Sequence, residues 1–390
     1  MLKAFLEDDS AKNQLKKSVY QLIHKKGKAS KVDFLNEINI PQTTLTRMVG
    51  ELEARGLIRT SGYGESSGGR PPALYEVVPN TGFVIGIEIS RTHVNIALLN
   101  IKFESIGQKR FTLTYSHTPV VTIDKVIHNI NVLLEEHLIP IDLLLGIGVG
   151  AVGPLDREKG IILNPEGFLA EGWKDVYIVT MFQSAFAVPV FLNNGANTAA
   201  LAEYEYHEFE NEDMLYCISG YGIRCGFINK GVSLNFREGD TSSYGHIIIE
   251  PNGRTCICGK KGCLNAYVSF DAIFKSIEET SNQTPFKLKT VDELLGLLIN
   301  NDDILKKLLE SAYYYGIAIA NMINILHPST VVLHGKLIYE SEDYYKEVIR
   351  VSKEHMYSTR RNNVVIRKGS LGEDSAAIGA AIQVFRGLFK

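Results

Sequence analysis

Apolar residues in the first 60 positions recur at the spacing of short amphipathic helices. The first predicted helix ends at Gly27, and its apolar stripe at i, i+4, i+7 and i+8 consists of Leu15, Val19, Leu22 and Ile23. The capping pair Ser30 and Asp33 predicts a second short helix. Pro41 opens a third helix that ends before Gly56, and its buried face is predicted to be Leu45, Met48, Val49 and Leu52.

Two predicted strands, 57–59 and 74–78, follow the helices and are joined by a Gly/Ser-rich loop. Three short helices followed by a hairpin indicate a winged helix-turn-helix domain in residues 1–80. In that motif the N-terminal end of the last helix meets base edges in the major groove. The side chains expected to point outward there are Gln42, Thr43, Thr44, Thr46 and Arg47. A polar face on a small helical bundle is the alternative interpretation.

Arg70 lies in the loop between the two strands, among glycines and prolines. From the tip of a wing it could extend into an A·T-rich minor groove, where the negative potential is strongest. A linker residue between domains is the alternative, and both readings can hold together.

Charge separates this region from the remainder of the chain. Residues 1–80 hold 12 basic and 9 acidic residues, whereas the whole chain has a net charge of −3. A basic segment on an acidic body suggests a polyanion, such as double-stranded DNA, as the partner of the first part only.

From residue 81 onward the pattern changes to strands and glycines. Strands 83–89 and 94–99 form a predicted hairpin, and 214–218 with 226–229 repeat it, which indicates a duplicated unit. The predicted helices are 123–137, 195–208, 291–309, 311–326 and 375–385. Residues 81–390 are therefore expected to form an α/β domain with two related lobes and a cleft between them.

Cysteines cluster in the run Cys256-Ile-Cys258-Gly-Lys-Lys-Gly-Cys263, and His246 lies ten residues upstream. Three thiolates and one imidazole make a closed tetrahedral set, which favours a structural Zn²⁺ over a catalytic metal. Reduced cysteines in a turn are the alternative. Cys217 and Cys225 are interpreted as small core residues.

Two motifs in this chain resemble those of the ROK family (repressors, open reading frames and sugar kinases). One is His246 followed by the cysteine cluster, and the other is Asn194-Gly-Ala-Asn-Thr-Ala-Ala-Leu-Ala-Glu203. The resemblance covers nearly all of residues 81–390 and implies an actin-like, sugar-kinase fold. With the basic segment in front, the architecture is similar to that of the transcriptional-regulator branch.

The departures from the family pattern concern catalysis. Where the kinases have the aspartate that takes the proton from the sugar hydroxyl, this chain has Gly195, which cannot act as a base. The phosphate-loop positions hold Arg91 and Arg224, and the expected glycine pair near the adenosine reads His334-Gly335. We therefore expect no enzymatic activity.

The sugar site implied by the resemblance is changed as well. Two family carboxylates correspond to Ser243 and Asn265, while Asn194 and His246 are retained. These four residues are the candidate effector site, and a different or weaker ligand than a hexose is expected. Loop scaffolding beside the metal is the alternative role.

These features predict a DNA-binding transcriptional regulator, most simply a repressor of carbohydrate-related genes, whose kinase-like body senses a small sugar or sugar derivative. A homodimer or a dimer of dimers would place two winged helices on a pseudo-palindromic operator. The alternatives are an active ATP-dependent sugar kinase with an accessory DNA-binding module, and a regulator controlled by a protein partner. No membrane span or secretory signal is recognised, so a cytoplasmic location is expected.

Overall fold

The structure is a computed structural model of the 390-residue chain. It describes residues 2–65, 71–207, 212–234, 242–279, 288, 290–298, 301–357 and 363–389. Arg70 lies outside the described residues. Contacts divide the chain into two compact units. Unit 1 comprises residues 1–151, 157–192 and 380–390, and unit 2 comprises residues 152–156 and 193–379.

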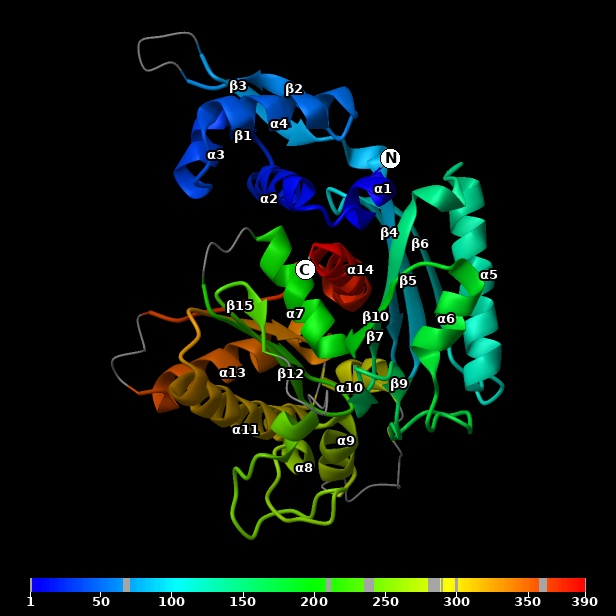
Figure 1. Cartoon of the computed structure of the whole chain (residues 1–390). Helices are drawn as coiled ribbons and strands as arrows, with labels where there is room; N and C mark the ends of the chain where they lie inside the picture. The colour runs from blue at the N-terminus through cyan, green and yellow to red at the C-terminus, as the bar shows by residue number, and fades with distance from the viewer. Residues whose placement is uncertain are drawn as a thin grey trace. The chain divides into compact units, whose positions relative to one another are not determined.

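The N-terminal part of unit 1 contains four helices and a small antiparallel sheet of order β1-β3-β2. Its elements are α1 (Leu2–Glu7), α2 (Ala11–Lys26), β1 (Ala29–Ser30), α3 (Lys31–Glu37), α4 (Gln42–Ala54), β2 (Ile58–Tyr63) and β3 (Ala73–Val77). Figure 1 shows them in blue. Helix α1 and strand β1 were not predicted from the sequence, because six and two residues are too short to show a periodicity.

Local sequence explains where these helices begin and end. The Ser30 hydroxyl accepts a hydrogen bond from the backbone N–H of Asp33, and the Asp33 carboxylate accepts one from the backbone N–H of Ser30. The predicted capping box is therefore confirmed. Helix α4 buries its predicted apolar face, and Gly56 follows it with a φ of +64°. Helix α1 ends against α2, where Asn13 donates to the carbonyls of Phe5 and Asp8.

The main sheet of unit 1 has the order β10-β7-β4-β5-β6. Its strands are β4 (Phe83–Ile89), β5 (His93–Asn100), β6 (Ser105–Thr112), β7 (Leu144–Ala151) and β10 (Val190–Asn194), the last of which ends in unit 2. β4 pairs antiparallel with β5 and parallel with β7. Two helices, α5 (Pro119–Glu136) and α6 (Ile178–Phe186), and the short strands β8 (Leu155–Asp156) and β9 (Ile161–Ile162) complete this stretch of chain.

The sheet of unit 2 has the order β13-β12-β11-β14-β15. Its strands are β11 (Met214–Ile218), β12 (Arg224–Asn229), β13 (Val232–Ser233), β14 (Thr330–His334) and β15 (Val365–Lys368). β11 pairs antiparallel with β12 and parallel with β14. In each sheet the first strand therefore sits between its hairpin partner and a later parallel strand, which confirms the duplication predicted from the two hairpins.

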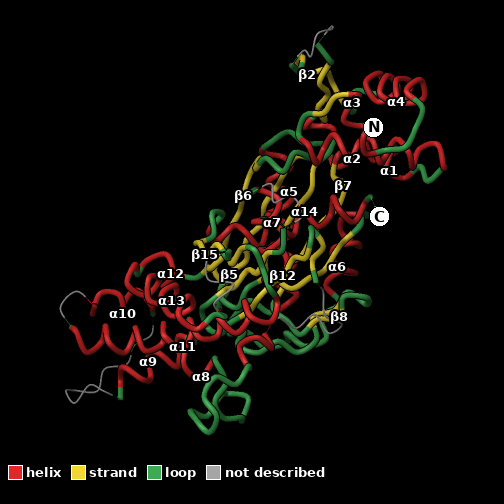
Figure 2. Tube along the Cα trace, turned by 90° about the vertical axis from the view of Figure 1, so that its left-hand side faces the viewer, coloured by secondary structure: helices red, strands yellow, loops and turns green. Residues whose placement is uncertain are grey.

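The helices of unit 2 pack on its sheet and on one another. They are α7 (Gly195–Tyr206), α8 (Asn265–Val268), α9 (Phe270–Glu278), α10 (Val291–Leu297), α11 (Asp302–Leu326), α12 (Lys336–Glu340) and α13 (Glu342–His355). Helices α11 and α13 lie side by side (Figures 1 and 2). The predicted break at residue 310 is wrong, because α11 runs through it and begins at Asp302, capped by Asn301.

Helix α14 (Ser375–Leu388) is the last element and belongs to both units, since the division falls between Gly379 and Ala380. In unit 1 it packs on β7, where a side chain at Gly148 would collide with the carbonyl of Ala380. Within the described residues, no helix is long and apolar enough to cross a membrane.

Candidate functional site

The predicted metal ligands converge in unit 2. One donor atom from each of His246, Cys256, Cys258 and Cys263 lies within 4.8 Å of the other three. Cys256 Sγ is 3.6 Å from His246 Nδ1, and Cys258 Sγ is 3.7 Å from Cys263 Sγ. A tetrahedral Zn²⁺ with ordinary bond lengths requires S–N and S–S separations of about 3.6 and 3.8 Å. The donor set therefore fits a four-coordinate metal both in chemistry and in spacing.

Backbone contacts fold the cysteine loop into this arrangement. The backbone N–H of Cys256 donates to the carbonyl of Lys260, and the backbone N–H of Gly259 donates to the carbonyl of Cys256. Gly259 and Gly262 have φ values of +80° and +77°, and a side chain at Gly262 would collide with the Glu250 carbonyl. The two glycines thus allow the chain to turn tightly around the four donors.

Two thiols of the cysteine run, Cys258 and Cys263, differ in acidity. The backbone N–H of Lys260 lowers the pKa of the Cys258 thiol, which is exposed. Burial raises the pKa of Cys263 to about 12. A divalent cation would stabilise both as thiolates, because it supplies the positive charge that the buried sulfur lacks.

The four candidate effector residues all lie in unit 2. Ser243 and His246 belong to the 3₁₀ turn Ser242–His246, and Ser243 is exposed. Asn265 is the first residue of α8 and accepts the N–H of Ile223. Its amide packs against Gly245 and Gly222, where added side chains would meet it. Asn265 therefore connects the loop before β12 with the turn that carries His246.

Asn194 caps helix α7 through a hydrogen bond from Ala196 N–H at 3.0 Å, and its side chain is buried. Gly195, which the sequence resemblance assigns to the position of the catalytic base, is the first residue of that helix. Asn265 also lines a hollow of about 460 Å³ beside the metal ligands, together with Tyr221, Arg254, Cys256 and Ser269 among others. The sequence did not predict that hollow.

Arg91, Arg224 and His334 are the residues that the sequence resemblance assigns to the nucleotide-binding loops. In unit 1, Arg91 Nε donates to the carbonyl of Glu166 at 2.7 Å, and the Arg91 side chain packs on Gly167. In unit 2, Arg224 begins β12, and His334 ends β14 with Nδ1 3.0 Å from the hydroxyl of Tyr339. Arg91 is thereby used to hold a neighbouring loop.

The predicted DNA-contacting residues lie at the N-terminal end of α4. Gln42, Thr43, Thr46 and Arg47 are exposed, and Thr44 is half-buried. They face away from the apolar residues that α4 buries. Such a row of amide, hydroxyl and guanidinium groups can donate to base edges and phosphates.

One contact that the sequence did not reveal fixes α4 against α2. The ammonium of Lys16, 4% exposed, pairs with Glu51 at 2.5 Å. Lys12 and Arg47 lie 3.6 and 3.8 Å from the same carboxylate. Periodicity does not show which lysine meets a carboxylate across two helices, so the pair cannot be predicted from the spacing of residues.

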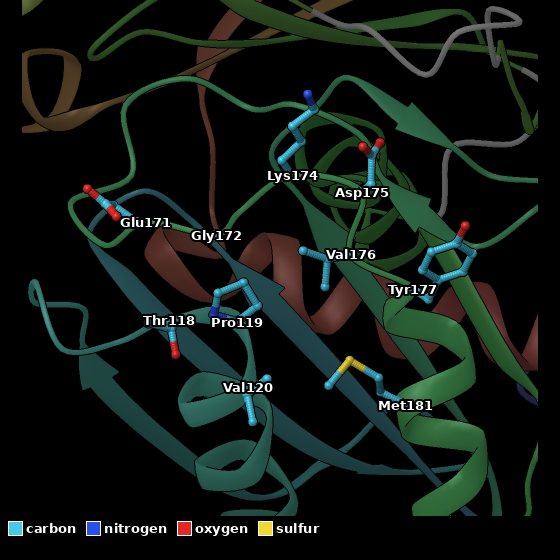
Figure 3. Close-up of a pocket in the computed structure, with 10 residues that line it drawn as sticks. All are labelled: Thr118, Pro119, Val120, Glu171, Gly172, Lys174, Asp175, Val176, Tyr177 and Met181. Carbon is cyan, nitrogen blue, oxygen red and sulfur yellow. The ribbon is translucent and has the colours of Figure 1, made fainter.

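Figure 3 shows a second hollow, of about 610 Å³, in unit 1. Val120 from the start of α5, with Val176, Tyr177 and Met181 at the start of α6, gives it an apolar lining. None of the candidate effector residues contributes to it. The neighbouring Trp173 is buried, stacks on Phe168 at 4.4 Å and donates its indole N–H to the His117 carbonyl.

Comparisons with known proteins agree with these features. The ROK family profile matches residues 84–386. The xylose repressor of Bacillus subtilis (strain 168) is 27% identical over 340 residues, which cover 87% of this chain and 86% of the relative.

Solved structures share the fold. One is a ROK family transcriptional regulator, described as a homologue of the E. coli MLC protein, which aligns with a TM-score of 0.79 at 21% identity. The alignment covers 97% of this chain and 96% of the regulator's chain. The ROK hexokinase of Thermus thermophilus aligns with a TM-score of 0.67 at 25% identity, over 78% of this chain and 99% of its own. The family profile spans more than half of the chain, so the chain belongs to the ROK family.

Proposed function

We propose that this protein is a DNA-binding transcriptional regulator that represses carbohydrate-related genes. The observation that carries the proposal is the exposed polar face at the start of α4, presented opposite a fully buried apolar face. The family profile begins only at residue 84, so this helix belongs to a segment added in front of the family body. The similarity to a xylose repressor along 87% of the chain supports the same conclusion.

Residues 1–80 act as a winged helix-turn-helix domain in this proposal. Helices α2, α3 and α4 supply the three-helix core, and β2 with β3 supplies the wing. Gln42, Thr43, Thr44, Thr46 and Arg47 contact the major groove, and Arg70 reaches the minor groove. A homodimer, or a dimer of dimers, presents two such domains to a pseudo-palindromic operator.

Residues 81–390 serve as a sensor that has no kinase activity. Gly195 offers no proton acceptor, and Arg91 is engaged with a neighbouring loop. A Zn²⁺ held by His246, Cys256, Cys258 and Cys263 fixes the turn that also carries Ser243. Asn194, Ser243, His246 and Asn265 then present polar groups to a small sugar or sugar derivative.

DNA binding tests the proposal directly. The purified protein is titrated onto a fluorescent duplex of its own upstream region, and anisotropy is followed across a salt series. Specific binding that weakens log-linearly with salt is expected, because phosphate contacts release counterions. Binding indistinguishable from that of an unrelated duplex would contradict the assignment.

Arg47→Ala is the informative variant, since the Arg47 side chain is 61% exposed and its ion pair with Glu51 is long, at 3.8 Å. We expect about a five- to hundredfold loss of affinity. Arg350→Ala is the matched control, because Arg350 is an exposed arginine on α13 that also pairs with glutamates. Equal affinity of both variants would remove α4 from the interface.

A panel of sugars and sugar phosphates, including xylose, is then added to the protein–DNA complex. Release by one compound identifies the effector class. Release by none favours control by a protein partner.

A further inference from the structure

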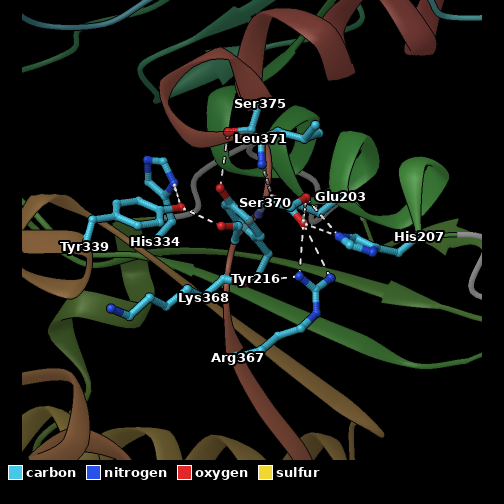
Figure 4. Close-up of polar contacts among 11 residues, drawn as sticks. Glu203, His207, Tyr216, His334, Tyr339, Arg367, Lys368, Ser370, Leu371 and Ser375 are labelled. Carbon is cyan, nitrogen blue, oxygen red and sulfur yellow. Dashed lines mark hydrogen bonds and ion pairs between the residues drawn. The ribbon is translucent and has the colours of Figure 1, made fainter. Parts of the chain in front are cut away.

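Helix α7 holds the segment that leads into α14 through one buried carboxylate, Glu203 (Figure 4). The backbone N–H groups of Ser370 and Leu371 donate to Glu203 Oε1 at 2.6 and 3.0 Å. On Oε2, the Ser370 hydroxyl donates at 3.1 Å and Arg367 at 3.3 Å, and His207 lies 3.3 Å away. Glu203 itself is fully buried.

A buried carboxylate is strongly destabilising unless donors surround it, and removing the donors leaves an uncompensated charge. Two of the donors of Glu203 are the main-chain N–H groups of 370 and 371, four to five residues before α14 begins. Charge-assisted hydrogen bonds are short and directional. Glu203 therefore fixes the path of the backbone that enters α14.

Helix α7 contacts α14 at a second point in unit 2. A side chain at Gly379 would collide with the carbonyl of Thr198, so the two helices touch backbone to backbone there. Residues 194 and 195, at the start of the same α7, are the candidate effector residue and the former catalytic position. One helix of 12 residues, α7, therefore carries both features. The candidate effector residue Asn194 caps its first turn, and Glu203 lies near its other end.

The other end of α14 lies in unit 1 and packs on α2. Phe385 stacks on His24 with ring centres 4.1 Å apart, and Phe389 stacks on Tyr20 at 5.8 Å. Phe103 completes the aromatic cluster from the body of unit 1. The next turn of α2 toward its start carries Lys16, which pairs with Glu51 of α4.

We infer that α14 couples the effector-binding end of α7 to the DNA-contacting helix α4, and that Glu203 is the positioning residue that sets this coupling. The inference rests on the proposed function for its two end points. Physically, a shift of α7 displaces the backbone at 370–371 and at Gly379, and the rigid helix α14 carries that shift to Tyr20 and His24.

Hydrogen–deuterium exchange on the full chain tests the coupling without DNA or effector. Glu203→Gln keeps the shape of the side chain but replaces one carboxylate oxygen by an NH₂ group. That group is a donor and cannot accept the hydrogen bonds that the surrounding donors give to Glu203. We expect exchange about threefold or more faster at residues 370–389 and also in α2. The metal loop at 246–263 should be unchanged, whereas a merely destabilising substitution would accelerate it too.

Glu342→Gln is the matched control. Glu342 is an exposed carboxylate that pairs with Lys368 at 3.0 Å, next to Arg367, but it lies on α13. Its variant should leave exchange in α2 unchanged. The inference is overturned if Glu203→Gln accelerates hydrogen–deuterium exchange only at residues 370–374 and leaves exchange in α2 as it is in the unsubstituted protein.

If Glu203→Gln does not fold, Ser370→Ala takes its place. This variant removes one hydroxyl from the cluster and keeps both backbone donors. A smaller acceleration with the same distribution over α14 and α2 is expected, and acceleration restricted to the substituted loop again contradicts the coupling.

Anisotropy with the upstream duplex separates the inference from the proposed function. Glu203→Gln should bind about three- to tenfold more weakly, since α4 is less firmly placed. If the unsubstituted protein binds no DNA specifically, the proposed function fails while the exchange result still decides the coupling. Equal DNA affinity of Glu203→Gln and the unsubstituted protein, where both bind, overturns the role of Glu203 in placing α4.

Discussion

At the scale of single residues, two positions to which the resemblance assigns chemistry make structural contacts. Asn265 accepts a backbone N–H from Ile223, and Arg91 donates to the carbonyl of Glu166. Gly195 opens α7 without offering any side chain. The sequence identified these substitutions, but only the contacts show that two of them hold loops in place.

Cys258→Ser should abolish metal binding by the purified protein. The variant lacks one of four donors, so the closed tetrahedral set is broken and the loop loses its cross-link. We expect zinc per chain, measured by elemental analysis, to fall from about one to near zero, with a lower thermal midpoint.

Cys217→Ala is the control for that experiment. Cys217 is buried and faces Cys225 across the hairpin, outside the metal cluster. It should lose stability but keep its zinc. Retention of zinc by Cys258→Ser would refute the four-ligand site.

At the scale of elements, contact between helices decides how α4 is held. Glu51→Gln removes the partner of the nearly buried Lys16 ammonium and should destabilise the N-terminal domain by about 2 kcal/mol. Urea denaturation followed by circular dichroism measures the change. Glu354→Gln, which disrupts an exposed pair on α13, should cost less than about 0.5 kcal/mol.

The same pair gives the N-terminal domain a pH dependence. The hydrogen bond from Lys16 lowers the pKa of Glu51 below its usual 4.5, and Ser30 similarly lowers the pKa of Asp33 below 3.8. Because the folded-state pKa values are depressed, this stabilisation is complete above the usual values and is lost as the pH falls through the folded ones.

The difference in stability between the unsubstituted protein and Glu51→Gln should therefore be full at about pH 7 and shrink below about pH 4.5. Thermal unfolding of both proteins across a pH series measures it. A difference that stays constant down to about pH 3 would show that the Glu51 charge does not contribute.

At the scale of the whole molecule, the fold is shared with a ROK hexokinase. The sequence resemblance assigns Gly195 to the position of the kinase base. Neither the unsubstituted protein nor Gly195→Asp should hydrolyse ATP in a sugar-dependent way. The added carboxylate would restore an acceptor, but Arg91 still occupies the first phosphate loop. A coupled ATPase assay with xylose and hexoses, run beside a ROK hexokinase, decides the point.

Much of the local structure could be predicted from short stretches of sequence. The capping box at Ser30, the buried face of α4, the two hairpins and the metal donor set follow from short-range spacing, which the backbone geometry converts directly into contacts. The domain boundary at residue 80 and the roles of the site residues stay predictions. Around residue 310 the sequence misplaced a helix boundary, because the helical spacing continues through that position.

The long-range partners, by contrast, depend on how the whole chain packs. Lys16 meets Glu51 across two helices, Glu203 meets the backbone of residues 370 and 371, and Phe385 meets His24 from opposite ends of the chain. Periodicity specifies which face of an element is buried but carries no information about which distant element covers it. The partner of a buried charge is fixed by the packing of the whole fold, because that packing excludes water and leaves one set of donors within reach.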